Sequence, residues 1–319
     1  MWGGRRYHSL DYYLKETFGK KLYKLSLDGG MNCPNRDGKI SYGGCIFCSE
    51  GGSGDFAAPL KNDIDSQIEY AKTIVSKKST DNRYIAYFQS YTNTYASVEY
   101  LRKLFMPVIL RNDIAILSIA TRPDCLDDDV LELISELVKI KPVWIELGLQ
   151  TVHGSTAEFI NRGYTLNCYD TAVKNLKKIG VSVITHMIVG LPHETKEQIL
   201  QTAAYIGQSG ADGIKLQLLH VLKNTGLEQM YKNRDFETLT EKEYVSLIAD
   251  IINILPENIV IHRLTGDGDK KILISPLWSC DKRRVLNLIG HELKIRNIVQ
   301  GAESEKYLSE HKEIFINMT

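Results

Sequence analysis

The stretch NCPNRDGKISYGGCIFC, residues 32–48, holds three of the six cysteines in this 319-residue chain. Cys33, Cys45 and Cys48 lie among glycine and polar residues, which is typical of a loop. A structural zinc ion takes four protein ligands, whereas an iron–sulfur cluster bound by only three cysteines keeps one iron open for another ligand. The spacing leaves two interpretations: a [4Fe–4S] cluster with an open iron, or a zinc ion completed by a distant histidine or cysteine.

This loop follows the first of several short β-branched runs, which alternate with amphipathic stretches of helical length. Strands are expected near residues 22–27, 83–89, 114–120, 143–149, 181–189 and 213–219. Helices are expected at residues 63–77, 97–110 with a bend at Pro107, 128–139, and 167–179 before Gly180. Such alternation is typical of a parallel sheet covered by helices. Six units are too few for a closed eight-stranded barrel, so the sequence predicts an α/β fold with a partial (β/α)6 TIM-like barrel.

The regular alternation of β-branched runs with stretches of helical length changes near residue 236. A helix is expected at residues 241–254, a strand at 259–262, and further helices after a glycine-rich turn. We therefore interpret residues 1–235 as the barrel with a basic amino-terminal segment. Residues 236–319 are expected to form a small α/β extension that caps the barrel.

The composition is that of a folded protein with no overall charge. There are 39 Lys and Arg against 39 Asp and Glu, so any binding to a polyanion must be local, for example at the basic, aromatic segment 1–24. The sequence shows neither a secretory leader nor an apolar run of membrane-spanning length, so we expect a cytoplasmic protein. In that reducing compartment, clustered cysteines indicate metal or redox use. Cys125, Cys168 and Cys280 are interpreted first as buried apolar side chains, and a second catalytic role stays open for Cys125 and Cys280.

Polar segments, or segments marked by glycine and proline, follow each of the six expected strands. They are residues 32–48, 90–94, 121–125, 150–151, 190–193 and His220. In parallel βα folds, reactive groups gather on loops at the carboxyl ends of the strands. We therefore expect these segments to surround one site.

Several of these motifs together resemble the radical S-adenosylmethionine (radical SAM) enzymes. The three-cysteine loop, with Phe47 before its last cysteine, resembles their cluster site, and segments 146–150, 161–164 and 186–192 resemble the middle of their fold. Within this superfamily the chain is similar to the catalytic subunit of Elongator and to oxygen-independent coproporphyrinogen dehydrogenase. It resembles the bacterial YtqA/YhcC-like proteins more closely and nearly end to end, through segments 1–4, 88–95 and 262–267.

The resemblance implies a [4Fe–4S] cluster on Cys33, Cys45 and Cys48, with S-adenosyl-L-methionine (SAM) at the open iron as the source of a 5′-deoxyadenosyl radical. The residues implied to bind SAM are Phe47, Gln89, Ser90, Thr92, Asn93, Gln150, Arg162 and Ile188. Arg162 would bind the methionine carboxylate, Gln150 would face the ribose and Ile188 the adenine. Taken alone, Arg162 reads as an exposed charge and Ile188 as a core residue. The offset of Arg162 from Gln150 favours the ligand role.

The chain also departs from the family pattern. Eleven residues separate Cys33 from Cys45, which is wider than the commonest family spacing. Many relatives carry glycines where residues 89–91 stand here, and Ala120 replaces an acidic residue of the Elongator-like branch. These differences concern the cluster loop and the cofactor contacts.

The resemblance implies a substrate as well. The Elongator catalytic domain is directed at the wobble uridine of transfer RNA, and the YtqA-like branch is associated with remodelling of its 5-substituent. The implied reaction therefore converts a carboxymethylaminomethyl group to an aminomethyl group, with an electron donor such as flavodoxin or ferredoxin. The residues implied to act on the substrate at the barrel mouth are Tyr91, His262, Arg263 and Asp267.

Three alternatives stay open at this point. The same radical chemistry could be directed at a small metabolite or a peptide. The chain could instead be an RNA-binding barrel with a structural metal and no catalysis. Residues 262–267 could be a turn stabilised by its own side chains rather than a substrate contact.

Overall fold

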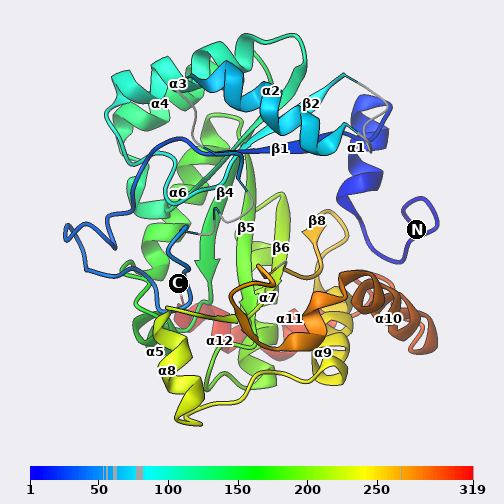
Figure 1. The fold of residues 1–319 in the computed structure, drawn as a ribbon. Coiled ribbons are helices and arrows are strands. Elements are labelled where there is room, and N and C mark those ends of the chain that lie inside the picture. Colours follow the sequence, from blue (N-terminus) through cyan, green and yellow to red (C-terminus); the bar gives the residue numbers. More distant parts are fainter. Residues whose placement is uncertain (53, 55–56, 60–62, 77–81, 267, 319) are drawn as a thin grey trace.

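The computed structural model describes residues 1–319 except 53, 55–56, 60–62, 77–81, 267 and 319. Its main sheet has seven parallel strands in the order β1-β2-β3-β4-β5-β6-β8. They are β1 (Tyr23–Leu27), β2 (Tyr84–Phe88), β3 (Ile114–Thr121), β4 (Val143–Gln150), β5 (Ser182–Val189), β6 (Gly213–Leu218) and β8 (Val260–Arg263). Figure 1 shows the sheet curled into a half-barrel with helices around it. The predicted partial barrel is thus confirmed, and each of the six expected strands is present close to its predicted bounds.

The seventh strand differs from the prediction. The sequence places a strand at residues 259–262 in the carboxy-terminal extension, but β8 pairs in parallel with β6 in the main sheet. Helix α9 (Glu241–Ile254) lies between these two strands in the chain, as in an ordinary βαβ crossover. The sheet therefore has one strand more than the six that the sequence predicts.

Helices cover the outer face of the sheet because their apolar stripes pack on the outward-facing strand residues. Those that follow the strands are α2 (Ile64–Val75), α3 (Val98–Leu110), α4 (Asp128–Val138), α5 (Gly154–Phe159), α6 (Leu166–Lys178), α7 (Lys196–Gln208) and α9. Asp63 and Thr165 cap α2 and α6 by accepting a hydrogen bond from a backbone amide. Gly180, with φ of +81°, lies just beyond α6 as predicted. Among the helices that the structure describes, none has the length and apolar character of a membrane span.

The amino-terminal residues fold onto the carboxy-terminal part of the chain. The remaining α-helices and strands are α1 (Leu10–Phe18), β7 (Val221–Leu222), α8 (Gly226–Lys232), β9 (Leu273–Ser275), α10 (Lys282–Ile295), α11 (Ser304–Glu310) and α12 (Lys312–Met318). The His8 amide donates a hydrogen bond to Gln300 Oε1 at 2.8 Å, and Arg6 Nη1 donates one to Asn297 Oδ1 at 3.1 Å. Trp2 stacks on the His8 ring at 5.6 Å between ring centroids. The basic segment 1–24 is therefore part of the folded body.

Helix α1 closes the amino-terminal end of the barrel. Its buried Leu14 belongs to an apolar cluster formed by Leu14, Leu22, Ile85, Ile116, Trp144 and Ile184. The last four lie near the starts of strands β2 to β5. Alternate residues of a strand point to the same face, so the next interior positions along the strands lie two residues further on. Those positions are occupied by Lys24, Tyr87, Ser118, Glu146 and His186.

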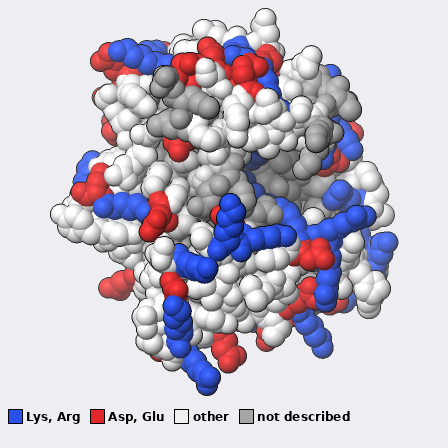
Figure 2. All heavy atoms as spheres, viewed as in Figure 1, with Lys and Arg blue, Asp and Glu red and all other residues white. Residues whose placement is uncertain are grey.

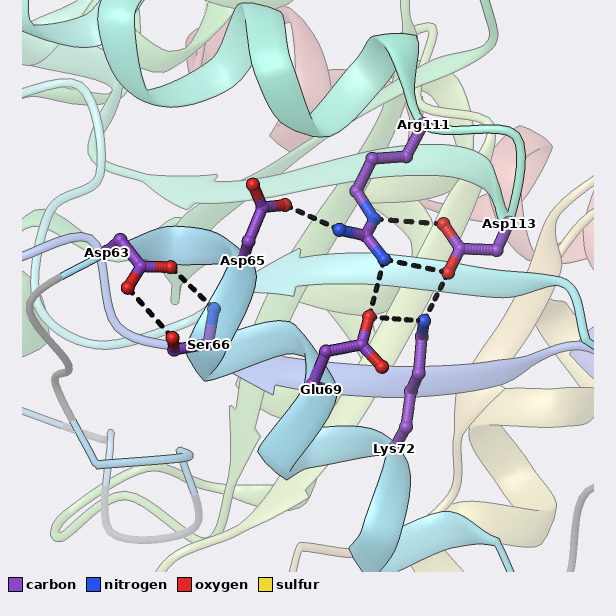
Figure 3. A network of polar contacts seen from close by, with 7 residues as sticks. All are labelled: Asp63, Asp65, Ser66, Glu69, Lys72, Arg111 and Asp113. Carbon is purple, nitrogen blue, oxygen red and sulfur yellow. Dashed lines mark hydrogen bonds and ion pairs between the residues drawn. The ribbon is translucent and has the colours of Figure 1, made fainter.

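On the outside, a group of charged residues fixes α2 to the start of β3. Arg111 donates hydrogen bonds to Asp65 and Glu69 of α2 and to Asp113, with Nε 2.9 Å from Asp113 Oδ1. Lys72 pairs with Glu69 at 2.7 Å and with Asp113. Figure 3 shows that these side chains point toward one another. We call these five residues the outer network, in which two cations face three carboxylates.

Candidate functional site

The curled sheet surrounds a cavity of about 610 Å³. The predicted site residues that line it are Cys33, Cys45, Phe47, Cys48, Gln89, Tyr91, Thr92, Gln150, Arg162, Ile188 and Arg263. Ser90, Asn93 and His262 do not line it, and Asp267 lies outside the described residues. Segments far apart in the sequence thus meet at one place.

The cysteine loop is folded by its own turns. A bridge between Asp37 and Tyr42 turns the chain back between the first two cysteines, which accommodates their wide spacing. The Cys48 amide donates a hydrogen bond to the Cys45 carbonyl at 3.0 Å. Cys33, Cys45 and Cys48 consequently lie on the wall of the same cavity.

The chemistry of these thiols fits a cluster. Burial, together with the neighbouring Cys48 and Cys33, raises the pKa of the Cys45 thiol to about 12. A bound cationic metal offsets this cost, because metal ligation favours the thiolate. Among the described residues, no three His, Cys, Asp or Glu side chains converge as the ligands of a single ion would. In a [4Fe–4S] cluster each cysteine binds a different iron, so such convergence is not required.

The segment after β2 is tied to the cysteine loop. The Thr92 amide donates a hydrogen bond to the Asn32 carbonyl at 3.3 Å. The Tyr91 amide donates one to the Gly52 carbonyl, just beyond the loop, at 2.9 Å, and Tyr91 has φ of +55°. Asn93 Nδ2 donates to the Ala120 carbonyl at 2.9 Å. The Ser90 Oγ and Asn93 Oδ1 atoms are buried without a hydrogen-bond partner among the described residues. Ser90 and Asn93 are thus buried without lining the cavity, whereas Tyr91 lines it.

Arg162 is buried, so its reading as an exposed charge is wrong. It is 2% exposed, and its guanidinium donates four hydrogen bonds to the backbone carbonyls of Leu149, Thr151 and Tyr164, at 2.6–3.1 Å. A guanidinium has five N–H donors, so one remains for a ligand. Gln150 lies beside it with φ of +69° and an unpartnered, buried Oε1 among the described residues. In this arrangement Arg162 can give a carboxylate one hydrogen bond rather than a two-pronged pair.

An apolar wall completes the cavity. Ile188 packs in a buried cluster with Ile160, Leu191 and Leu219, and Phe47 packs against the same cluster. Ile188 and Phe47 also line the cavity. An apolar wall of this kind suits a base such as adenine, the partner predicted for Ile188.

His262 and Arg263 are neighbours in the chain but lie in different surroundings. Arg263 lines the cavity, and its Nη1 donates a hydrogen bond to Gln217 Oε1 at 3.4 Å. The His262 ring packs edge-on against Trp144 at 5.0 Å between centroids. Burial lowers the pKa of His262 well below its usual value. Of the described residues predicted to act on the substrate, Tyr91 and Arg263 lie at the cavity and His262 does not.

Sequence comparison supplies the family. Residues 33–206 match the Radical SAM superfamily, and residues 211–295 match the Radical_SAM C-terminal domain. The chain belongs to the radical SAM superfamily. Proteins of this superfamily use a [4Fe–4S] cluster and SAM and need an electron donor, so the cofactors predicted from the sequence are confirmed.

Two bacterial relatives of this radical SAM protein align over most of their length. YtqA of Bacillus subtilis (strain 168) is 46% identical over 297 residues, which cover 93% of this chain and 92% of YtqA. YhcC of Escherichia coli (strain K12) is 36% identical over 271 residues, which cover 85% and 86%. The predicted resemblance to YtqA/YhcC-like proteins is confirmed.

More distant similarities lead to Elp3 and to a transfer RNA enzyme. The structure of Elp3 from the archaeon Methanocaldococcus infernus superposes with a TM-score of 0.65 at 16% identity, covering 88% of this chain and 64% of Elp3. That likeness shows the fold. A Methanocaldococcus jannaschii protein named tRNA uridine(34) acetyltransferase is 26% identical over 161 residues, which cover 50% of this chain and 29% of that protein.

The site predicted from the sequence omits several charged side chains that lie inside the radical SAM barrel. Glu146 is fully buried, accepts hydrogen bonds from Lys24 Nζ at 2.8 Å and His186 Nε2 at 2.7 Å, and pairs with Lys215. Burial would raise the pKa of Glu146, but Lys215 and Lys24 outweigh it and lower the pKa well below its usual value. Burial lowers the pKa of His186 to about 4, so this ring is neutral near pH 7. With the nearby Tyr87 and Ser118, we call these residues the inner network.

A signal for the inner network is present in the sequence. The strands around it are almost wholly apolar, yet Lys24, Glu146 and Lys215 stand inside them. A charged residue within a buried strand is uncommon unless it is paired or binds something. Applying the two-residue period to the predicted strands would have placed these side chains inside the barrel.

Proposed function

We propose that this radical SAM enzyme acts on the 5-substituent of the wobble uridine of transfer RNA and converts a carboxymethylaminomethyl group to an aminomethyl group. Similarity to a protein named tRNA uridine(34) acetyltransferase supports an RNA substrate. The described Lys and Arg residues that line the cavity are Lys24, Arg36, Arg122, Arg162, Lys215 and Arg263, and the described acids are Glu146 and Asp269. This local surplus of positive charge, in a chain of zero net charge, is the observation that carries the proposal.

The surface is compatible with a polyanion as well. On the face drawn in Figure 2, Lys and Arg side chains lie together across the middle of the molecule. Phosphate groups bind such local clusters through contacts that weaken with added salt. The uridine has to leave the anticodon stack for its substituent to enter the cavity, as in other enzymes that modify a base.

The residues of the chain have distinct tasks in this proposal. The cluster and SAM, when bound, would supply a 5′-deoxyadenosyl radical that takes a hydrogen atom from the carboxymethyl group. Loss of one further electron from the substrate to an iron–sulfur or flavin acceptor, followed by hydrolysis of the resulting imine, would release the two carbons as glyoxylate and leave the aminomethyl group. Cys33, Cys45 and Cys48 bind the cluster, and Tyr91 and Arg263 contact the substrate. The residues proposed to hold SAM are Phe47, Gln89, Ser90, Thr92, Asn93, Gln150, Arg162 and Ile188, with Ser90 and Asn93 acting through the backbone they support. Flavodoxin or ferredoxin serves as the electron donor.

We also propose a division of labour along the chain. Residues 1–235 provide most of the barrel and the cofactor site. Residues 236–319 complete and cap it, since β8 adds the last strand and Arg263 reaches the cavity.

The experiment compares transfer RNA from wild-type and deletion strains, digested to nucleosides and analysed by mass spectrometry. We expect the deletion strain to accumulate 5-carboxymethylaminomethyluridine and to lose 5-aminomethyluridine. A plasmid copy of the wild-type gene should restore the profile, and a Cys45→Ala copy should not. An unchanged nucleoside profile would contradict the proposal and favour a small metabolite or a peptide as the substrate.

A further inference from the structure

Two lysines share one carboxylate at the inner end of the cavity. Lys24 Nζ lies 2.8 Å from Glu146 Oε1, and Lys215 Nζ pairs with Glu146 Oε2. Lys215 is 4% exposed and Glu146 is fully buried. Asp269, the other described acid in the lining, belongs to the loop after β8. At this end of the cavity Glu146 can therefore balance only one of the two lysines.

Glu146 has no capacity left for a ligand. Its Oε1 accepts from Lys24 and from Ser118 Oγ, and its Oε2 accepts from His186 Nε2 and from Lys215. A carboxylate offers about four lone-pair sites, so these four donors fill it. Glu146 is a fixed counterion rather than a general base.

The lysines, in contrast, keep N–H donors that no described residue accepts. An ammonium group has three N–H bonds. Lys24 uses one on Glu146, while Lys215 uses one on Glu146 and one on the Tyr87 hydroxyl at 3.0 Å. The Tyr87 ring lies 4.4 Å from Lys24 Nζ and 4.2 Å from Lys215 Nζ, measured to the ring centroid, and its face attracts both cations. The remaining N–H bonds are available to a ligand in the cavity that both lysines line.

The charge imbalance favours an anion here. A buried cation without a counterion is costly, and burial together with the cations of Lys24 and Arg263 lowers the pKa of Lys215 well below its usual value, although Glu146 opposes this. The neutral His186 supplies no negative charge. A bound anion would supply the missing counter-charge to both lysines at once.

We propose that Lys24 and Lys215 form a subsite for a carboxylate group of the substrate. The identity of the substrate, whose carboxymethyl group is the anion, rests on the proposed function. The class of ligand, a carboxylate, does not. Lys24 and Glu146 lie three and four residues before the ends of β1 and β4, which is about 10–13 Å below the rim at a strand rise of about 3.3 Å per residue. The tip of a base substituent can reach that depth, whereas a backbone phosphate of a folded RNA stays outside.

The test measures a preference between two ligands. Anticodon stem–loop RNAs carrying 5-carboxymethylaminomethyluridine or its carboxamide are titrated into the anaerobically reconstituted enzyme. The wild type should prefer the carboxylate by about tenfold or more, since a hydrogen bond between charged groups is worth roughly that factor. Lys24→Met and Lys215→Met should bring the ratio toward one. The matched control is Lys141→Met, because Lys141 Nζ is bonded to the Ile114 carbonyl at 2.9 Å and does not line the cavity.

A second variant and a second ligand separate the possible outcomes. Glu146→Gln keeps the shape but removes the counterion, so it should tighten binding of the carboxylate RNA severalfold. Affinity for SAM should stay unchanged in Lys24→Met and Lys215→Met. A parallel loss of SAM affinity would assign the lysines to the cofactor and overturn the subsite.

The proposed function can fail separately from the subsite. If the lysine variants keep the wild-type preference, the subsite is overturned while the transfer RNA function stands. If neither RNA binds, N-methylglycine is titrated as a small carboxylate. Binding that is lost in both lysine variants would support the subsite without the transfer RNA, and binding that is absent or unchanged would overturn it.

Discussion

In the outer network Lys72 and Arg111 face three carboxylates, whereas in the inner network Lys24 and Lys215 share Glu146. The outer groups are partly exposed, with the Glu69 side chain 58% accessible, and they join one helix to the start of a strand. In the inner network Glu146 is fully buried and Lys215 is 4% exposed, whereas the Lys24 side chain is 22% accessible; all three line a cavity. Lysine and carboxylate side chains thus stabilise the fold in the outer network, whereas in the inner network they form a site that is suited to a ligand.

The difference lies in what each network needs to be complete. The outer network contains enough counter-charge within itself, and surface ion pairs of this sort contribute little to stability. The inner network is short of negative charge in a region where unpaired charge is costly. Balance within a charged cluster therefore indicates whether it serves the fold or a bound molecule.

The largest expected contrast is chemical. Cys45→Ala removes one of the three cysteine ligands, so we expect loss of the cluster and of SAM cleavage. Asp113→Asn, in the outer network, should retain both. Iron content and released 5′-deoxyadenosine, measured anaerobically, check this pair. Turnover that survives in Cys45→Ala would show that the cluster is held elsewhere.

The next contrast concerns stability. Glu146→Ala leaves the buried Lys215 and the partly exposed Lys24 without a counterion and should lower the free energy of unfolding by about 3–5 kcal/mol. Asp113→Ala should cost about 1 kcal/mol or less, because Asp65 and Glu69 still face Arg111. Urea denaturation of both variants and the wild type measures the difference. Equal costs would mean that burial does not distinguish the networks.

The inner network should also respond first to acid. Burial lowers the pKa of His186 from 6.5 to about 4, so between these values the unfolded chain binds more protons than the folded one. Stability should therefore fall as the pH drops from 6.5 to 4, by up to about 1.4 kcal/mol per pH unit. His186→Gln should reduce this slope when unfolding is measured across that range. An identical slope in the variant would show that His186 does not cause this pH dependence of stability.

The outer network should respond at lower pH. Burial would raise the pKa of Asp113, but hydrogen bonds from Arg111 and Lys72 outweigh it and lower the pKa from 3.8 to about 2. The stabilising contribution of Asp113 is present above pH 3.8 and is lost as the pH falls toward 2. The difference in unfolding free energy between wild type and Asp113→Asn should shrink in that window. A difference that persists at pH 2 would contradict this.

The smallest expected contrast separates stability from activity. Lys215→Met leaves Lys24 paired with Glu146, so no charge is stranded, and the unfolding free energy should change by only about 1 kcal/mol. Lys72→Met should have a similarly small effect. Only Lys215→Met should reduce turnover of the carboxylate substrate, measured beside the unfolding curves. A Lys215→Met enzyme with full turnover would remove the distinction between the networks.

Much of the fold could be predicted from local patterns. β-branched runs and helix caps such as Asp63 and Thr165 depend on neighbours in the chain, and their positions agree with the structure. The pairing of β8 with β6 could not be predicted in the same way, because strand order depends on tertiary packing. Strand β8 has only four residues and lies where the alternation of strands and helices changes, so the local sequence does not indicate which strand it pairs with.

The candidate site was predictable in part for the same reason. The cysteine loop and the segments after the strands could be placed because they follow the strand ends. The burial of Arg162 could not, since its acceptors are carbonyls that the turn at Gln150 brings together. The inner network could have been predicted from the sequence, but only by working out which alternate residues of each strand point into the barrel.

Helix α1, with the apolar cluster around Leu14, gives the barrel a floor. A substituent whose tip rests on the lysines above that floor extends toward the cysteine loop over a fixed span. The floor thereby acts as a gauge: adding or removing one methylene from the substituent would bring a different carbon–hydrogen bond level with the radical. Selection of the bond to be broken would then be set by depth, from the end of the barrel farthest from the iron.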